Sequence, residues 1–270
     1  MMVQGRILRL TLAGLTSLAL AACQSATPGD GAVFNTATPE LAKNWQTAGP
    51  VKIEQLLRTG KAQGSPRLRN WLQDARENRA LAVGSPDRCG FAAVSQSEAT
   101  EAKARLEADK LCLRHIADYS AYAGTNCNCR IALINQTITA PPSAFARFGV
   151  YKMIVERPDG GRRTLRGTAE VSGNAGENNP VRMLDRAGQT ICTGNYAVTG
   201  RHADTGAGQG SFSLNCTHAD GTAKGRISVV GATGSRPAAR GEGGFPDGTQ
   251  IRFALGALGG PFNEFARELR

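Results

Sequence analysis

The stretch GVYKMIVERPDGGRRTLRGTAEV, residues 149–171, decides the fold class of the C-terminal half of the chain. Its first part, Val150–Glu156, is rich in β-branched and aromatic residues, which favour strands. Pro158–Gly161 combines proline, aspartate and glycine, which is typical of a tight turn. Strand-forming residues return over Thr164–Val171. The stretch therefore predicts two antiparallel strands joined by a turn.

The same pattern continues downstream of this hairpin. Of the 33 glycines in the chain, 23 lie between residues 149 and 260. Asp220-Gly221 and Asp247-Gly248 are pairs that favour hairpin turns. Further strands are expected at Val181–Leu184, Thr190–Val198, Gly210–Cys216, Gly225–Val230 and Gln250–Leu255. About seven short strands with turns between them predict a small antiparallel barrel or sandwich over residues 141–270.

Residues 40–140 predict a smaller module that mixes helices with strands. The helical spacing of apolar residues indicates two short amphipathic helices, around residues 53–57 and 68–72. Three short apolar runs, at residues 80–83, 90–95 and 131–134, predict strands. Pro141-Pro142 marks the boundary with the β region.

A long helix is expected between the second and third strands of this module. Ser95-Gln96-Ser97-Glu98 fits a capping box, in which a serine and a glutamate satisfy each other's backbone amides at a helix start. The residues expected on its buried side are Ala99, Ala102, Leu106, Leu113 and Ile116. The order strand, strand, long helix, strand is similar to a short α/β module of uncharacterised exported bacterial proteins, and this similarity implies no activity. The fold class expected is α+β: a small disulfide-stapled α/β module followed by an antiparallel β barrel or sandwich.

The N-terminal segment has the properties of an export signal. Arg6 and Arg9 precede Leu10–Ala22, which is uncharged and apolar. As a helix it rises about 20 Å, short of the roughly 30 Å hydrocarbon core of a bilayer. It ends in Leu20-Ala21-Ala22-Cys23, which resembles the lipobox of bacterial lipoproteins. The resemblance covers residues 1–23 and implies a signal peptide over residues 1–22 and a diacylglyceryl thioether on Cys23.

The alternative is an ordinary secretory signal with Cys23 as a free thiol. The odd number of cysteines, seven, favours lipidation of Cys23, because the other six can then pair. Residues 23–39 are small and polar, and we expect them to be a flexible tether. Gln24 and Ser25 follow the cysteine, where an aspartate would indicate retention at the inner membrane. The expected location is therefore the cell envelope, lipid-anchored at the outer membrane, on its periplasmic or surface face.

The six remaining cysteines predict disulfides, because exported proteins fold in an oxidising compartment. Cys192 and Cys216 lie on neighbouring expected strands, so we expect them to pair. Cys127 and Cys129 point to the same side of an extended segment and cannot easily bond each other. They are therefore expected to bond Cys89 and Cys112, with Cys112 joined to Cys129. A metal site formed by cysteines 112, 127 and 129 with His115 is the alternative, and its Cys-x-Cys spacing disfavours it.

No catalytic signature is found in the sequence. Gly-x-Ser-x-Gly, Ser-x-x-Lys and His-Glu-x-x-His motifs do not occur. Of the three histidines, His115 is expected near a helix end, His202 in a polar hairpin loop, and His218 on the surface beside a disulfide cysteine. Nothing identifies Glu242 and Asp247 as a catalytic carboxylate pair. We expect no catalytic residue, no metal and no cofactor.

Charge is the remaining indication of function. Removal of Arg6 and Arg9 with the signal peptide lowers the net charge from +10 to +8. Basic residues gather at Arg157, Arg162, Arg163, Arg166, Arg236 and Arg240. Such clusters bind anionic polymers, so anionic envelope polymers or lipopolysaccharide are expected partners, besides the membrane that holds the lipid. Nucleic acid is not expected, because no aromatic platform is interleaved with the basic residues.

The sequence thus predicts an outer-membrane lipoprotein with a non-enzymatic binding or structural role. Two alternatives stay open. One is an envelope hydrolase acting on cell-wall or carbohydrate material, with His202 as its base. The other is a surface adhesin or interaction factor.

Overall fold

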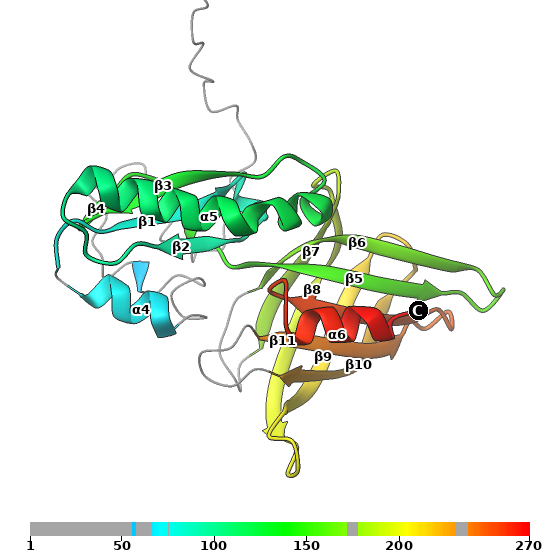
Figure 1. Ribbon diagram of the computed structural model, residues 1–270. Coiled ribbons are helices and arrows are strands. Elements are labelled where there is room, and N and C mark those ends of the chain that lie inside the picture. Colours follow the sequence, from blue (N-terminus) through cyan, green and yellow to red (C-terminus); the bar gives the residue numbers. More distant parts are fainter. Residues whose placement is uncertain (1–55, 58–65, 75, 172–177, 231–236) are drawn as a thin grey trace, which may run out of the picture. The chain divides into compact units, whose positions relative to one another are not determined.

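The first part of the described chain is a four-stranded antiparallel sheet with a helix on each side (Figure 1). The computed structural model describes residues 56–57, 66–74, 76–171, 178–230 and 237–270. Cys23, the signal peptide, the tether, most of the helix expected at 53–57 and Arg236 lie outside them. The elements of the module are α4 (Pro66–Gln73), β1 (Ala80–Ser85), η1 (Asp87–Cys89), β2 (Ala92–Val94), α5 (Glu101–Ala123), β3 (Asn128–Ile134), β4 (Thr137–Ile138) and η2 (Pro142–Phe145).

Strand alternation gives this sheet, ordered β2-β1-β3-β4, two apolar faces. Ala80 and Ala82 of β1 belong to the core that includes α5. Leu81 and Val83 belong to a second core that includes α4. The sheet is therefore buried on both sides, which explains why β1 is an uninterrupted apolar run.

Helix α5 begins later than the capping box predicts. Its N-cap is Thr100, whose Oγ1 accepts a hydrogen bond from the amide of Lys103. Ser95 is buried instead, and its Oγ accepts a hydrogen bond from the amide of Ala80 at 2.8 Å. The expectation of a start at Ser95 was wrong because this serine is used to extend the β1–β2 ladder.

The buried side of α5 also differs from the one expected. Apart from Tyr119 the buried residues are small or medium-sized, and all six follow a spacing of three or four: Ala104, Ala108, Cys112, Ile116, Tyr119 and Ala123. Leu106 and Leu113, expected inside, are 52% and 47% exposed. Small side chains allow the helix to approach the sheet closely, so residue size rather than hydrophobicity marks the packed side here.

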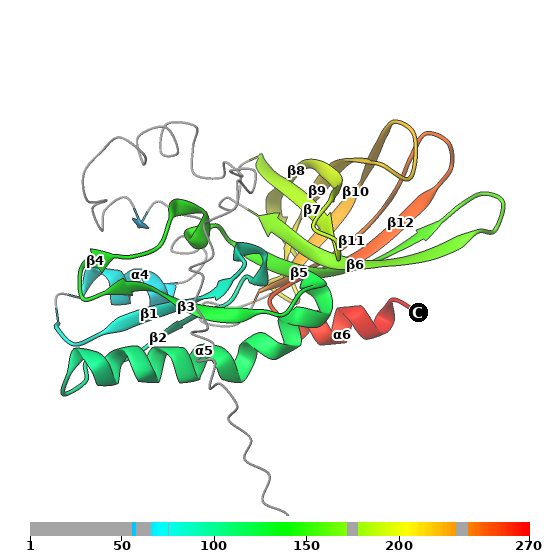
Figure 2. The ribbon, with the colours of Figure 1, turned by 90° about the horizontal axis from the view of Figure 1, so that it is seen from above.

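The second part is a closed barrel of eight strands (Figure 2). Its strands are β5 (Phe148–Glu156), β6 (Arg162–Val171), β7 (Asn179–Asp185), β8 (Thr190–Arg201), β9 (Gly208–Cys216), β10 (Thr222–Val230), β11 (Ala238–Gly244) and β12 (Gln250–Gly256). Each strand pairs antiparallel with its neighbours in sequence, and β12 pairs with β5 to close the barrel. The chain is thus α+β, and of the two architectures expected for the β region it has the barrel.

Side chains fill the inside of the barrel, as expected for eight strands. The buried cluster includes Met153, Met183, Leu214 and two phenylalanines, Phe212 and Phe253, whose rings contact edge to face. Tyr151 is also fully buried, and burial raises the pKa of its phenol. The barrel is therefore a packed core, and its polar chemistry lies at its ends and on its outer surface.

The strand β11 was missed in the sequence, because AARGEGG contains neither β-branched nor aromatic residues. Gly241 faces the inside, and a Cβ atom placed on it would lie 2.3 Å from the ring of Phe253 on the neighbouring strand. The large ring therefore fills the space that a side chain on β11 would need. The alternation of small residues with Arg240 and Glu242 was the available indication of this strand.

Helix α6 (Pro261–Glu268) packs on the outside of the barrel, against β11 and β12. Phe262 is fully buried and contacts Tyr122 of α5 edge to face. The Nζ of Lys152 on β5 donates hydrogen bonds to the carbonyls of Ala266, at 2.7 Å, and of Leu269. The outer face of β5, α5 and α6 thus share one apolar core.

Three disulfides cross-link the described chain. Two, Cys89–Cys127 and Cys112–Cys129, lie in the module, and Cys192–Cys216 joins β8 to β9. These are the pairs expected from the sequence. No helix in the described ranges is both long and apolar enough to span a bilayer.

Candidate functional site

The three histidines lie in three different environments. His115 is on α5, and its ring lies 5.2 Å from that of Phe91. His202 is exposed in the loop between β8 and β9, where its Nδ1 accepts a hydrogen bond from the amide of Asp204. His218 lies in the turn between β9 and β10, at the end of the barrel. The structure brings no two of them together.

The two carboxylates considered as a pair are also separated. Glu242 faces outward from β11 and lines a groove on the side of the barrel. Asp247 lies in the β11–β12 turn, where its Oδ1 accepts a hydrogen bond from the amide of Thr249 at 2.8 Å. The two residues belong to different hollows, so they do not form an acid–base pair.

Strand alternation divides the cations of the β5–β6 hairpin between two places. Arg162 and Arg166 face outward from β6, because Leu165 between them packs in the barrel core. Arg157 and Arg163 act electrostatically on His218 at the turn end of the barrel. The basic cluster seen in the sequence therefore contributes to two separate surfaces.

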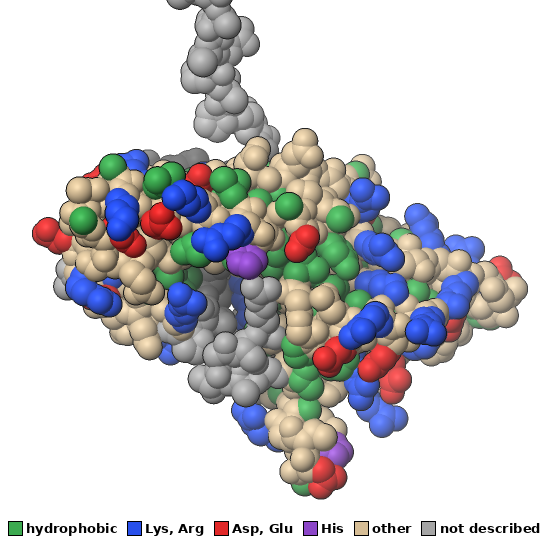
Figure 3. Space-filling view, viewed as in Figure 1, with side chains coloured by type: hydrophobic (Ala, Val, Ile, Leu, Met, Phe, Trp, Pro, Cys, Tyr) green, Lys and Arg blue, Asp and Glu red, His purple; other side chains and the backbone are tan. Residues whose placement is uncertain are grey.

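The outer face of β10, β11, β12, β5 and β6 is rich in basic side chains. Seven basic residues point outward: Lys152, Arg162, Arg166, Lys224, Arg226, Arg240 and Arg252. On these strands Glu156, Glu242 and the buried Glu170 also face outward, and Glu268 of α6 pairs with Arg240. Figure 3 shows lysine and arginine side chains gathered where Figure 1 places β5, β6 and α6. We call this surface the basic face.

A groove of about 1100 Å³ runs along part of the basic face. Its floor is formed by outward residues of β9–β12, and its sides by the β8–β9 loop and α6. Arg226, Glu242 and Arg252 lie in one row across its floor, since each is the register partner of the next. Hydroxyl groups of Ser211 and Ser228 lie among them.

Ion pairs hold some of the groove's arginines in place. Arg240 lies 3.4 Å from Glu268, and its guanidinium is 5.4 Å from the ring centre of Phe265. Arg252 lies 3.0 Å from Glu156. Arg226 is exposed and has no ion pair with a described residue. The groove therefore offers one free guanidinium beside two that are oriented by neighbours, an arrangement suited to phosphate or carboxylate oxygens.

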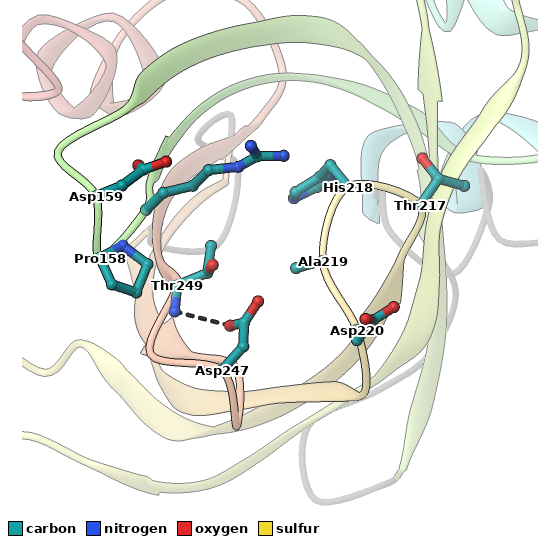
Figure 4. A pocket seen from close by; sticks show the side chains of 9 residues that line it. Pro158, Asp159, Thr217, His218, Ala219, Asp220, Asp247 and Thr249 are labelled. Atoms are coloured by element: carbon teal, nitrogen blue, oxygen red, sulfur yellow. Dashed lines mark hydrogen bonds between the residues drawn. The ribbon is translucent and has the colours of Figure 1, made fainter.

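A second, open hollow of about 540 Å³ lies at the turn end of the barrel (Figure 4). The β5–β6, β9–β10 and β11–β12 turns enclose it. Asp159 and Asp247 stabilise their own turns by accepting backbone hydrogen bonds. His218 and Asp220 come from the β9–β10 turn on the opposite side, as Figure 4 shows.

His218 is not the surface histidine expected from the sequence. Both of its ring nitrogens are buried, and neither has a hydrogen-bond partner among the described residues. Burial lowers the pKa of His218, and the positive charges of Arg163 and Arg157 lower it further. Its ring contacts Phe245 edge to face, which fixes its orientation. This environment could not be predicted from the residues around His218, because its burial comes from turns distant in the chain.

Comparison with known proteins adds no further assignment. No protein-family model, no curated protein and no solved structure matches this chain. The groove and the turn-end hollow are therefore interpreted from their own geometry.

Proposed function

We propose that this protein is a lipid-anchored envelope protein that binds an anionic polymer in the groove of its basic face. In this proposal, acylated Cys23 anchors the chain in the outer membrane, and residues 24–39 tether the folded part. A flexible coil of that length has an end-to-end distance of about 20 Å, which keeps the barrel close to the membrane surface. The role is one of binding, not of chemical conversion.

The observation that carries this proposal is the row of Arg226, Glu242 and Arg252 with Arg240 beside it. Three adjacent strands, β10, β11 and β12, present these side chains on a rigid, closed barrel, so their spacing is fixed before a ligand binds. Arginine binds phosphate and carboxylate groups through two parallel hydrogen bonds. The serine hydroxyls and the ring of Phe265 add contacts suited to sugar units.

Lipopolysaccharide is the probe that tests the groove, because it carries phosphate groups on sugars. Arg226→Gln with Arg240→Gln removes two cations from the groove. We expect binding at least tenfold weaker than that of the natural protein, since each hydrogen bond to a charged group contributes about 1.5–3 kcal/mol. The measurement is titration of immobilised lipopolysaccharide at several salt concentrations.

The matched control is Arg67→Gln with Arg114→Gln, which removes two exposed cations from α4 and α5. It lowers the net charge equally and leaves the groove intact. We expect it to weaken binding less than threefold. An equal loss of affinity in both double variants would show that only net charge matters and would refute the groove as the binding site.

The anchor is tested separately, by metabolic labelling with palmitate. Cys23→Ala is expected to abolish labelling and to release the protein from the membrane fraction. Persistent labelling of this variant would refute lipidation of Cys23. It would not affect the proposed binding in the groove, which the lipopolysaccharide titration tests separately.

A further inference from the structure

The turn-end hollow contains the imidazole of His218, whose buried nitrogens are not explained by the structure around them. Buried polar atoms in folded proteins nearly always have a hydrogen-bond partner, and an exception can mark the site of an ion. Neither ring nitrogen of His218 has such a partner among the described residues. The ring contact with Phe245 holds the imidazole in place although no side chain or backbone group of the described ranges binds its nitrogens.

Two sulfur atoms lie close to this imidazole. Cys192 and Cys216 lie directly opposite each other on β8 and β9. Their Sγ atoms and a ring nitrogen of His218 all lie within 4.8 Å of one another. Within the described ranges, no other group of three or more histidine, cysteine or acidic side chains has its ligand atoms so close together.

We propose that opening of the Cys192–Cys216 disulfide converts this end of the barrel into a binding site for Cu(I). The ligands are the two Sγ atoms and one ring nitrogen of His218. Thiolate sulfur is a soft ligand that selects Cu(I), and imidazole is a common copper ligand. The site is independent of the groove on the basic face and of any ligand bound there.

The conversion requires a dithiol reductant, such as a thioredoxin-like envelope protein. One reductant thiolate attacks one sulfur of the Cys192–Cys216 bond and forms a mixed disulfide with it, and the other cysteine leaves as a thiolate. The second reductant thiol then attacks the reductant's own sulfur in the mixed disulfide, and the first cysteine leaves as a thiolate. The reductant ends as a disulfide, and Cys192 and Cys216 have gained two electrons and two protons. Binding of Cu(I) then releases the two thiol protons.

The surroundings favour this outcome. Cys216 is only partly buried, beside the open hollow, so a reductant and an ion have a route to it. Two thiolates with one Cu(I) carry a net charge of −1, and Arg157 and Arg163 lie near enough to act electrostatically on His218. Their positive charges therefore favour the thiolate form of the ligands.

The test is anaerobic titration with Cu(I) against a chromophoric Cu(I) chelator, on protein reduced with a phosphine. Alkylation and mass mapping identify which disulfides have opened. We expect His218→Phe to lower the Cu(I) affinity at least tenfold, because phenylalanine keeps the ring contact with Phe245 but supplies no ligand. The matched control is His202→Phe in the exposed β8–β9 loop, and it is expected to change the affinity less than twofold.

Thiols of the module also bind copper once they are reduced, so stoichiometry provides a second measurement. Cys192→Ser with Cys216→Ser is expected to bind one ion fewer than the natural protein under the same reduction. The oxidised natural protein, whose fold is intact, is expected to leave this site unfilled. Equal affinity in reduced His218→Phe and natural protein, or equal stoichiometry in the double serine variant, would overturn the proposal.

Discussion

At the scale of single residues, packing inside the barrel depends on glycines whose missing side chains leave room for an aromatic ring on a neighbouring strand. Gly241 lacks a side chain, and the ring of Phe253 lies where its Cβ would be. A Cβ on Gly225 would lie 2.1 Å from the backbone oxygen of Glu242 and 2.7 Å from the ring of Phe212, so the backbone of β11 and a ring both occupy its space. These glycines are needed for packing, because neither has the positive φ that only glycine adopts easily.

Gly241→Ala is therefore expected to destabilise the barrel by about 1–3 kcal/mol, the usual cost of overpacking a core. Gly200→Ala is the matched control, because its Cβ would have no atom within 4 Å. It is expected to be neutral or slightly stabilising. Urea unfolding measures both, and equal midpoints for the two variants would contradict this account of β11.

A buried ion pair gives a second prediction at this scale. Glu170 and Arg182 are register partners that face outward from β6 and β7, yet Glu170 is only 2% exposed because η1 and α5 contact β6. Arg182→Met leaves the carboxylate buried without this cation, at an expected cost of about 3–5 kcal/mol. Adding Glu170→Gln is expected to recover part of that loss. A double variant no more stable than Arg182→Met would argue against the pair.

At the scale of elements, the sequence predicted what local composition determines. Seven of the eight barrel strands and the order strand, strand, helix, strand follow from β-branched runs and turn residues. The start of α5 and its buried face could not be predicted in this way, because packing against other elements decides the positions of Ser95 and Leu106. The outward cations of the hairpin follow from alternation once the strand is known. The groove could not be predicted, since α6 and the β8–β9 loop meet there only in the closed barrel.

The attachment of α6 provides the prediction for this scale. Lys152 donates hydrogen bonds to the last carbonyls of the helix, which have no partner within it. Lys152→Met is expected to weaken the last turn by about 1.5 kcal/mol, which is roughly a tenfold faster hydrogen exchange of its amides. Lys224→Met, an exposed outward residue of β10, serves as the control. Unchanged exchange in the Lys152 variant would mean that apolar contacts alone hold α6.

At the scale of the whole molecule, a shared core joins the module to the barrel. It includes Ala104 and Ile116 of α5, Val150 and Ile154 on the outer face of β5, and Phe262 of α6. Tyr119 adds a hydrogen bond from the amide of Leu258. Such shared burial couples the two parts, so we expect them to unfold in one transition.

Cys112→Ala with Cys129→Ala tests this coupling. The cross-link joins residues 17 apart in sequence, and its loss is expected to cost about 3 kcal/mol. Tryptophan fluorescence reports on the module through Trp71, and hydrogen exchange of the β9 and β10 amides, measured at each denaturant concentration, reports on the barrel. Both midpoints are expected to fall together. A shift of the fluorescence midpoint alone would show that the two parts unfold independently.

The pairing of β12 with β5 also has a consequence for the order in which the molecule is assembled. The ion pair between Arg252 of β12 and Glu156 of β5 joins residues 96 positions apart, and the other six barrel strands lie between them in the chain. During synthesis β5 can pair with β6 as soon as β6 has been made. It can pair with its other neighbour, β12, only after the last strand has been made. Closure is thus a late, long-range step, and such steps are slow compared with the formation of hairpins. Until then, the apolar strand Phe148–Glu156 presents an open edge, the kind of surface that chaperones protect from aggregation.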